Sequence, residues 1–180
     1  MERLLYILKK LIPRPLFRLF QPYYHRLLAY IGAIKYKHPS KDITVLAVTG
    51  TKGKSSTVEL LARILRADGK KVASLSTIQF QVGDEVHRNL YKMTMPGRFF
   101  VQKFLRDAVD AGCTYAVVEM TSEGAKQFRH TYIDIDGLLF TNLTPEHIES
   151  HGSFKKYKQA KLKLAQAVAD SPKRPRFFAA

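Results

Sequence analysis

The stretch VTGTKGKSSTVELL, residues 48–61, joins an apolar segment to a helical pattern through a turn that contains glycine. The preceding run ITVLAVTG (43–50) is short, apolar and β-branched, which is typical of a strand buried on both faces. The following segment, Ser55–Asp68, has apolar residues at helical spacing, and Gly69 is placed to end the helix. A strand, a turn and a helix in this order favour anion binding, because unpaired N–H groups and the helix dipole point at the turn.

Two glycines, a lysine and a serine in this turn suit a phosphate group. Gly50 and Gly53 allow close backbone approach, Lys54 can reach terminal phosphates, and the Ser55 hydroxyl can ligate Mg²⁺. The common pattern G-x-x-x-x-G-K-[ST] has its first glycine where this chain has Val48. The alternative is a turn rich in glycine and serine with solvated lysines. The position between a buried strand and a helix favours phosphate binding, so we expect a nucleotide site.

Short apolar strands and helical patterns alternate along the rest of the chain. KKVASLSTIQFQV (70–82) is interpreted as one strand, and a turn at Gly83 leads to a return strand around 86–91. The other predicted strands are CTYAVVEM, IDGLLFTNL and RPRFFAA, and the other predicted helices cover Phe99–Ala111, 122–130 and Phe154–Ala169. This order predicts an α/β fold with a mostly parallel sheet flanked by helices.

Polar residues follow two of these strands. Ligands of open α/β sheets collect at the carboxyl ends of the strands, so Glu119, which ends YAVVE, would lie beside the phosphate loop if the two strands are neighbours. Its carboxylate could hold Mg²⁺ or pair with a lysine. TNLTPEHIESHG follows the third strand and contains His147 and His151. A lone histidine in a loop is usually a surface residue, but the position of these two at the carboxyl end of a strand favours a functional role.

The net charge of +15 belongs to the ends of the chain. Residues 1–38 carry eight Lys and Arg against one acid, whereas residues 39–154 carry fourteen against thirteen. We interpret residues 1–42 as a basic amphipathic N-terminal helical segment and linker, with apolar residues at 4, 5, 8, 11 and 12 on one face. Packing on the following domain is one interpretation. The other is peripheral contact with an anionic membrane, helped by aromatic side chains at 17, 20, 23 and 24.

Composition narrows the class of protein. No apolar stretch reaches the ~20 residues of a membrane-spanning helix, and the N-terminus does not resemble a signal peptide. The single cysteine, Cys113, excludes an intrachain disulfide, suits a reducing compartment and is expected in the core. A basic membrane- or nucleic-acid-binding module with a vestigial phosphate loop is an alternative of another class. The nearly neutral middle disfavours it, and nucleic acid is not expected as a partner.

Three ordered stretches resemble the Mur ligase family, the ATP-dependent ligases of peptidoglycan precursors. They are TGTKGKSST (49–57), VVEMTSEGAKQFR (117–129) and FTNLTPEHIESHGSFKKYKQAK (140–161). The family's loop has the form T-G-T-x-G-K-[ST]-[ST], which accounts for Val48. MTMPGR (93–98) lies where the muramoyl-tripeptide synthetases have a Thr-Thr-Pro element, so the chain resembles that branch most. The resemblance implies that residues 43–180 form a P-loop NTPase-like Mur ligase central domain, incomplete at its C-terminus.

The resemblance also implies roles for single residues. The loop that would wrap the ATP phosphates comprises Gly50, Thr51, Lys52, Gly53, Lys54, Ser55 and Ser56. Lys54 would stabilise charge on the transferring phosphoryl group, and Ser55 and Glu119 would hold one Mg²⁺. Glu119 and His147 would hold a second Mg²⁺, helped by Lys161, which matches the lysine that the family carbamylates. The positions that match contacts with the UDP-muramoyl-peptide substrate are Thr94, Thr121 and Arg129.

The implied reaction is a cytoplasmic ligation in which a substrate carboxylate attacks the γ-phosphate and an amino acid then displaces phosphate from the acyl phosphate. Folylpolyglutamate- and cyanophycin-type synthetases are the alternative enzymes. Three departures from the pattern stand out: Met95 replaces the second threonine, only 42 residues precede the first strand, and the later strands and C-terminal domain are missing. We therefore expect weak nucleotide binding at most and no ligase turnover by this chain alone.

Overall fold

A mostly parallel sheet forms the centre of the computed structural model, which describes residues 14–91, 93–146, 148–173 and 176–179. Within these residues the sheet has seven strands in the order β4-β3-β2-β5-β1-β6-β7. Their bounds are Thr44–Thr49 (β1), Val72–Leu75 (β2), Gln79–Val82 (β3), Glu85–Arg88 (β4), Tyr115–Glu119 (β5), Gly137–Phe140 (β6) and Arg176–Ala179 (β7). All neighbouring pairs are parallel except β2–β3 and β3–β4. The predicted α/β fold class is confirmed.

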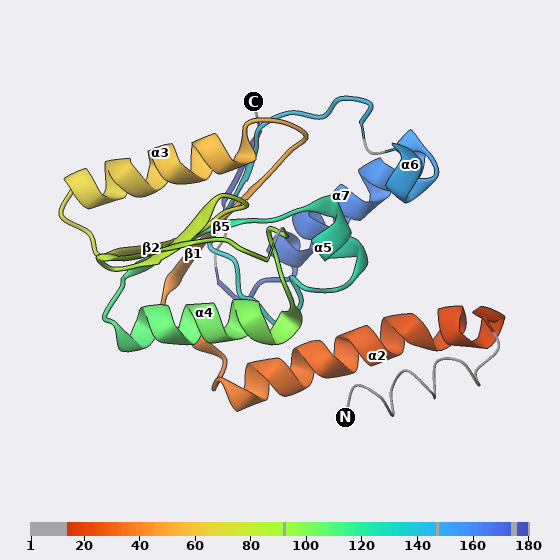
Figure 1. Cartoon of the computed structure of the whole chain (residues 1–180), viewed down its shortest axis with the longest axis horizontal. Coiled ribbons are helices and arrows are strands. Elements are labelled where there is room, and N and C mark those ends of the chain that lie inside the picture. Colours follow the sequence, from red (N-terminus) through yellow and green to blue (C-terminus); the bar gives the residue numbers. More distant parts are fainter. Residues whose placement is uncertain (1–13, 92, 147, 174–175, 180) are drawn as a thin grey trace.

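Helices cover both faces of the sheet, with α3 on one side and α4 on the other (Figure 1). Their bounds are Arg14–Lys35 (α2), Lys54–Ala67 (α3), Arg98–Asp110 (α4), Ser122–Lys126 (α5), Ile148–His151 (α6) and Phe154–Ala169 (α7), with a 3-10 turn at Pro39–Lys41. The predicted helices that correspond to α3, α4 and α7 agree with these bounds to within one residue. The short helix α6 was not predicted.

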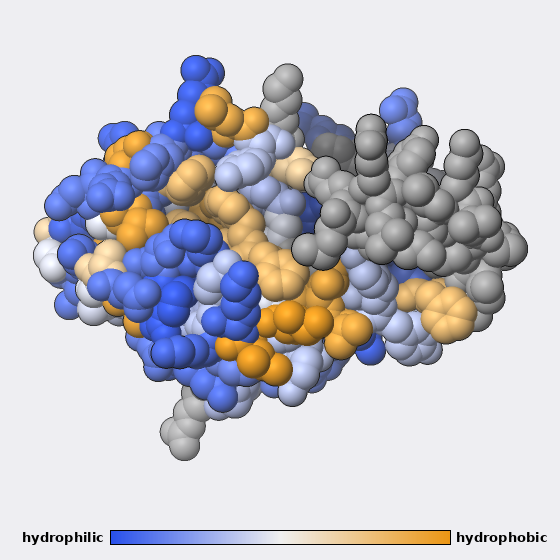
Figure 2. All heavy atoms as spheres, turned by 60° about the horizontal axis from the view of Figure 1, so that its bottom comes forward, coloured by the Kyte–Doolittle hydropathy of each residue, from blue (hydrophilic) through white to orange (hydrophobic). Residues whose placement is uncertain are grey.

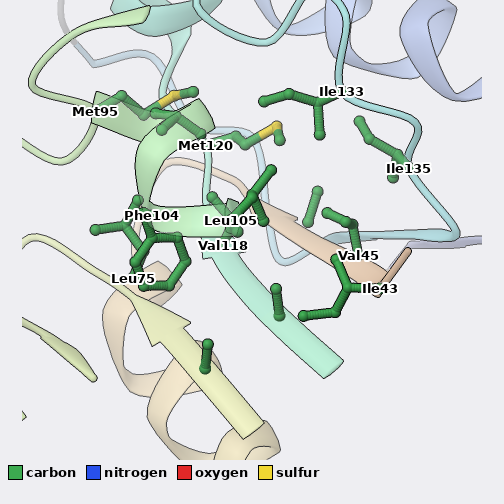
Figure 3. Packing of buried hydrophobic residues seen from close by; sticks show 14 of the residues in the cluster. Ile43, Val45, Leu75, Met95, Phe104, Leu105, Val118, Met120, Ile133 and Ile135 are labelled. Atoms are coloured by element: carbon green, nitrogen blue, oxygen red, sulfur yellow. The ribbon is translucent and has the colours of Figure 1, made fainter. Parts of the chain in front are cut away.

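Two apolar layers hold the helices on the sheet. Under α3, Val58 and Ala62 pack on Val48 and Val117. The larger layer lies on the opposite face, where α4 and α7 cover side chains such as Leu75, Val118 and Ile135; Figure 3 shows part of this packing. Each layer takes alternate residues of the same strands, because successive side chains of a strand point to opposite faces. Cys113 is buried in the larger layer, as predicted.

The prediction of one strand over residues 70–82 is wrong, because the chain reverses between β2 and β3. The Ser76 backbone N–H donates to Gln79 O at 2.9 Å, and the Ser76 hydroxyl accepts from the N–H groups of Ile78 and Gln79, both at 3.2 Å. A serine that bonds to nearby backbone groups competes with a strand ladder and favours a turn. Ile78, expected to alternate with Phe80 inside one strand, is 65% exposed instead.

Helix α2 packs on the α/β domain beside α4 (Figure 1). Small residues on one side of α2, Ala29 and Ala33, are buried there. The helix passes through Pro22 without interruption. The described part of the N-terminal segment therefore packs on the domain, which was one of the two interpretations of its sequence. The apolar face predicted at residues 4, 5, 8, 11 and 12 lies outside the described residues.

Candidate functional site

The predicted phosphate loop lies at the carboxyl end of β1, which is placed between β5 and β6 in the sheet. Gly50 has φ +152°, and a Cβ atom there would overlap Thr141 Oγ1. Gly53 has φ +79° and is the N-cap of α3. Both positions therefore require glycine, one for space next to β6 and both for backbone conformation. The loop leads directly into the first turn of α3, where N–H groups face an anion site.

Asn142, which follows β6, braces the loop from the side. Its Oδ1 accepts from the N–H groups of Thr51 at 3.1 Å and Lys52 at 2.9 Å, and its Nδ2 donates to Lys52 O at 3.1 Å. Thr51 Oγ1 also lies 2.9 Å from the Tyr157 hydroxyl of α7. Sequence reasoning missed both Asn142 and Tyr157. A signal for Asn142 was present, since an amide directly after a strand of a parallel sheet reaches the loop after the neighbouring strand.

The two lysines of the loop point to different surroundings. Lys54 Nζ donates to Thr51 O at 2.9 Å and lines a cleft beside the loop. Lys52 Nζ lies 2.8 Å from Glu146 Oε1, and 73% of the Lys52 side chain is exposed. The hydrogen bond to Glu146, together with its charge, raises the pKa of Lys52. Lys54 is therefore the loop lysine whose ammonium group can reach a phosphate bound inside the cleft.

Glu119 ends β5 and is buried against the loop. Its register partner on β1 is Val48, so the two strands are neighbours, which is the condition on which its predicted position depended. Glu119 Oε2 accepts from Ser55 Oγ at 2.7 Å and from Thr77 N at 2.9 Å, and both carboxylate oxygens lie within 3.2 Å of Thr77 Oγ1. Thr77 Oγ1 in turn lies 2.6 Å from Thr94 Oγ1. This chain of oxygen atoms links the first turn of α3 to the segment that contains Thr94.

Lys161 is buried on the inner face of α7, with 2% of the residue exposed. Its Nζ donates to Gly50 O at 2.6 Å and lies 5.0 Å from the centre of the Tyr157 ring. Burial lowers the pKa of Lys161 to about 7, the charge of Lys54 acts in the same direction, and Glu119 opposes both. From the sequence alone Lys161 was one of several lysines on a solvated helix. The structure places it against the phosphate loop instead.

Arg129 and Thr121 lie on the far side of the cleft. The Arg129 guanidinium donates to Met95 O and, at 2.7 Å, to Gln127 Oε1, and burial lowers its pKa. The Thr121 hydroxyl accepts from Gly124 N at 3.0 Å and so caps α5. Met95, where the resemblance implied threonine, is 1% exposed and belongs to the core. The segment with Thr94 is thereby fixed between the sheet and α5.

One cleft of about 370 Å³ brings seven of the predicted residues together: Gly50, Lys54, Thr94, Glu119, Thr121, Arg129 and Lys161. His151 lines the same cleft, and its Nε2 lies 3.1 Å from Ser122 Oγ. Ser56 lies in the first turn of α3. His147 lies outside the described residues. The cleft therefore joins the phosphate loop to the residues that the resemblance assigned to substrate.

The oxygen atoms around the loop suit Mg²⁺ better than a soft metal ion. No group of three or more His, Cys, Asp and Glu side chains able to hold a metal occurs in the described part of the chain. Ser55 and Glu119 nevertheless place a hydroxyl and a carboxylate 2.7 Å apart at the loop. Mg²⁺ in proteins commonly takes one or two carboxylates and completes its shell with water and substrate phosphates, so these residues fit such an ion.

Comparisons with known proteins identify related sequences. The family described as Mur ligase middle domain matches residues 48–173. A UDP-N-acetylmuramyl-tripeptide synthetase from Treponema denticola is 36% identical over 149 residues, which is 82% of this chain and 28% of that protein. The chain thus spans less than a third of this curated relative.

Solved structures show the same fold. A UDP-N-acetylmuramoyl-L-alanyl-D-glutamate–2,6-diaminopimelate ligase matches with a TM-score of 0.62 at 24% identity, over 76% of this chain and 31% of that chain. The MurF ligase from Thermotoga maritima, in complex with ADP, matches with a TM-score of 0.57 at 18% identity, over 86% of this chain and 31% of that chain.

Proposed function

The chain belongs to the Mur ligase family, and we propose that residues 43–180 form the ATP-using domain of a ligase that adds an amino acid to a UDP-N-acetylmuramoyl peptide. The observation that carries this proposal is the buried Glu119 carboxylate bonded to Ser55 at the head of α3. A carboxylate held beside a phosphate loop suits a nucleotide bound with a divalent cation.

In this proposal the loop from Gly50 to Ser56 wraps the β- and γ-phosphates of ATP. The N–H groups at the start of α3 face the phosphates, and the helix dipole favours their negative charge. Lys54 exchanges its hydrogen bond with Thr51 O for the transferring phosphoryl group. Asn142 holds the loop in this shape, since it bonds the backbone of Thr51 and Lys52. Such preorganisation avoids the cost of ordering the loop when ATP binds.

Ser55 and Glu119 would hold one Mg²⁺ between the loop and the phosphates. The ion would supply positive charge where an anionic carboxylate must approach an anionic phosphate. The Thr77 N–H and hydroxyl orient the Glu119 carboxylate from its other side, as partners of metal ligands commonly do.

Lys161 is proposed to act as a carbamate that helps to hold a second Mg²⁺ with Glu119 and His147. A neutral amine adds to CO₂, with loss of a proton, to give an anionic carbamate. The lowered pKa of Lys161, about 7, leaves a substantial neutral fraction near neutral pH, which supports this step. Its place 2.6 Å from Gly50 O puts the new carboxylate beside the loop.

Thr94, Thr121 and Arg129 are proposed to bind the muramoyl peptide in the same cleft. There the peptide's carboxylate oxygen would bond to the γ-phosphorus as ADP leaves, giving an acyl phosphate. The amino group of the added amino acid would then displace phosphate and form the amide. The chain's own contribution is position and charge: Arg129 and Lys54 line the same cleft, and we propose that Arg129 faces the substrate and Lys54 the nucleotide.

We further propose a cytoplasmic setting, where ATP and nucleotide-linked precursors occur, with residues 1–42 as the segment that contacts a membrane surface. The sequence carries nine Lys and Arg and no Asp or Glu between positions 3 and 41. Such a segment is drawn to anionic lipid. The nearly balanced charge of residues 39–154 gives no comparable support for nucleic acid as a partner.

Nucleotide binding tests the proposal directly. Fluorescent ADP should bind the purified chain more tightly with Mg²⁺ than with EDTA. Lys54→Ala should weaken binding by about tenfold or more, which corresponds to ~1.4 kcal/mol. Lys70→Ala, beyond the other end of α3, is the matched control and should leave the affinity unchanged. Equal affinities for the Lys54 variant and the unaltered chain would refute the proposed role of the loop.

A further inference from the structure

Helix α2 carries a row of large apolar and aromatic side chains that stay exposed; Tyr30, at the edge of this row, reaches the α/β domain, where its ring centre lies 5.4 Å from that of Tyr132. We call this row the outer stripe of α2; its members are between 42% and 68% exposed, and they are Phe20, Tyr23, Tyr24, Leu27, Tyr30, Ile31 and Ile34. Their spacing of three and four residues places them along one side of the helix. Ala29 and Ala33 lie on the other side and are buried in the domain. Apart from Tyr30, the outer stripe is therefore separate from the surface that attaches α2 to the fold.

The outer stripe forms part of a hydrophobic patch on one face of the molecule. Figure 2 brings the α2 side forward and shows hydrophobic side chains gathered there between hydrophilic ones. From Phe20 to Ile34 the helix rises ~21 Å at 1.5 Å per residue. A contiguous exposed patch of this kind marks an interaction site in a folded protein. Phe20, Tyr23 and Tyr24 are 47–68% exposed and so bury little of their surface in the packing of this domain.

The charged residues near the outer stripe indicate what kind of surface it binds. Helix α2 contains no acidic residue, and Arg26, Lys35 and Lys37 are exposed on or just after it. The Arg26 guanidinium lies 4.8 Å from the centre of the Phe128 ring, and Lys163 of α7 lies 4.7 Å from the same ring. Both groups lie where α2 meets the domain, since Arg26 is three residues from the buried Ala29, and Lys35 and Lys37 are the exposed cations near the end of the outer stripe. An anionic surface complements them, whereas a second copy would bring like charges together.

The helix itself is unsuited to crossing a bilayer. Among the described residues, no helix is long and apolar enough to do so. Three of the seven members of the outer stripe are tyrosines, whose rings favour the boundary between headgroups and acyl chains. A helix with one apolar face, a basic flank and interfacial aromatic residues lies in the plane of the membrane.

We infer that α2 lies flat on an anionic lipid bilayer, with its outer stripe inserted at the headgroup boundary and its basic side chains on lipid phosphates. This inference rests on the proposed membrane contact of the N-terminal segment and specifies the surface that makes it. It is independent of the ligase reaction. The α/β domain, attached through Ala29 and Ala33, is then held at the membrane surface with its cleft in water.

The absence of tryptophan from the sequence allows a direct test. Tyr23→Trp and Tyr30→Trp each place one fluorescent probe in the outer stripe. Ile64→Trp is the matched control, because Ile64 is an equally exposed apolar residue on α3, which covers the other face of the sheet. With vesicles of phosphatidylcholine and phosphatidylglycerol, the probes at 23 and 30 should shift to the blue and be quenched by brominated lipid. The probe at 64 should do neither.

Co-sedimentation with the same vesicles completes the experiment. The triple variant Tyr23→Ser/Leu27→Ser/Ile31→Ser should bind at least about tenfold more weakly, since each truncated side chain removes apolar area from the lipid. Leu60→Ser/Ile64→Ser on α3 should bind as the unaltered chain does. Circular dichroism of each variant verifies that the fold is retained. Vesicles of pure phosphatidylcholine, or high salt, should weaken binding.

Each of the other possible results would overturn a defined part of the inference. Vesicle binding without a shift at 23 or 30 would overturn the role of the outer stripe and leave membrane contact through other residues. No binding to anionic vesicles would overturn the inference and the proposed membrane contact together. A blue-shifted spectrum of the probe at 23 already present without vesicles would show that protein covers the outer stripe, and the lipid assignment would be wrong.

Discussion

The Ser55 hydroxyl donates to the Glu119 carboxylate at 2.7 Å, which joins the first turn of α3 to the end of β5. The contact follows from the strand order, because β5 is the direct neighbour of β1 and places Glu119 opposite Val48. Ser55 and Glu119 are far apart in the sequence, yet both lie at the carboxyl edge of the sheet. This edge is where the proposed nucleotide and the proposed peptide substrate meet.

Glu119→Gln should remove most of the effect of Mg²⁺ on nucleotide affinity. Glutamine keeps the shape and can still accept from Thr77 N, but it lacks the charge that binds a cation. We expect the gain in ADP affinity from Mg²⁺ to fall by about tenfold, while the free energy of unfolding changes by about 1 kcal/mol or less. Titrations with and without EDTA measure this. Glu85→Gln, on the exposed hairpin, is the control; an undiminished Mg²⁺ effect in Glu119→Gln would exclude Glu119 as a ligand.

Lys161→Met should alter how stability depends on pH. Burial lowers the pKa of Lys161 to about 7, whereas an unfolded lysine titrates near 10.4. Between these values the unfolded chain binds more protons, so the free energy of unfolding rises with pH. Methionine carries no charge to desolvate, and the variant should be more stable at pH 6 by roughly 1–3 kcal/mol and lack that rise.

Urea unfolding at several pH values tests this expectation. Lys158→Met, at an exposed position of the same helix, should keep the dependence of the unaltered chain. A Lys161→Met variant whose stability rises between pH 7 and 10 as before would show that Lys161 is not the group responsible.

Gly124→Ala should destabilise the substrate side of the cleft. A Cβ atom at 124 would lie 2.5 Å from Met95 Sδ and 3.2 Å from Thr121 Oγ1. Because the core around Met95 is closed, we expect a loss of ~1–3 kcal/mol in the free energy of unfolding. Gly97→Ala is a suitable control, since nothing lies within 4 Å of a Cβ atom there.

A double-mutant cycle with Met95→Thr separates this overlap from a general effect on α5. The threonine shortens the side chain that the new methyl group would meet, so Gly124→Ala should cost less in the Met95→Thr background. Additive losses in the two backgrounds would contradict the proposed contact. The overlap also gives a reason for Met95 at the position where the resemblance implied threonine: the larger side chain fills space that Gly124 leaves open.

Sequence periodicity predicted the parallel strands and the three longer helices α3, α4 and α7, because each has a regular apolar spacing and a clear end. It did not predict the turn at Ser76, where the serine hydroxyl accepts hydrogen bonds from the N–H groups of Ile78 and Gln79 within an otherwise continuous strand-like sequence. The position of Glu119 beside the loop was predicted on the condition that β1 and β5 are neighbours, and the strand order meets this condition. The burial of Lys161 was not predicted, since its position on the inner face of α7 depends on how that helix packs against the loop.

His130 should make the fold sensitive to acid, independently of the cleft. It is 4% exposed, its Nδ1 has no hydrogen-bond partner within the part of the chain that the structure describes, and burial lowers its pKa to about 4, helped by Lys163 and Arg26. An unfolded histidine titrates near 6.5, so the unfolded chain binds more protons between these values. The free energy of unfolding should therefore fall by roughly 2–3 kcal/mol as the pH drops from 6.5 to 4.

His130→Phe should remove this fall, because phenylalanine does not titrate. Urea unfolding between pH 4 and 7 is the measurement, with His87→Phe in the exposed hairpin as the control that keeps the original slope. Protonation of carboxylates in acid also lowers the free energy of unfolding. The decisive quantity is therefore the difference between the two variants in how far that free energy falls between pH 7 and pH 4. If His130→Phe and His87→Phe lose stability in parallel down to pH 4, the acid sensitivity does not come from His130.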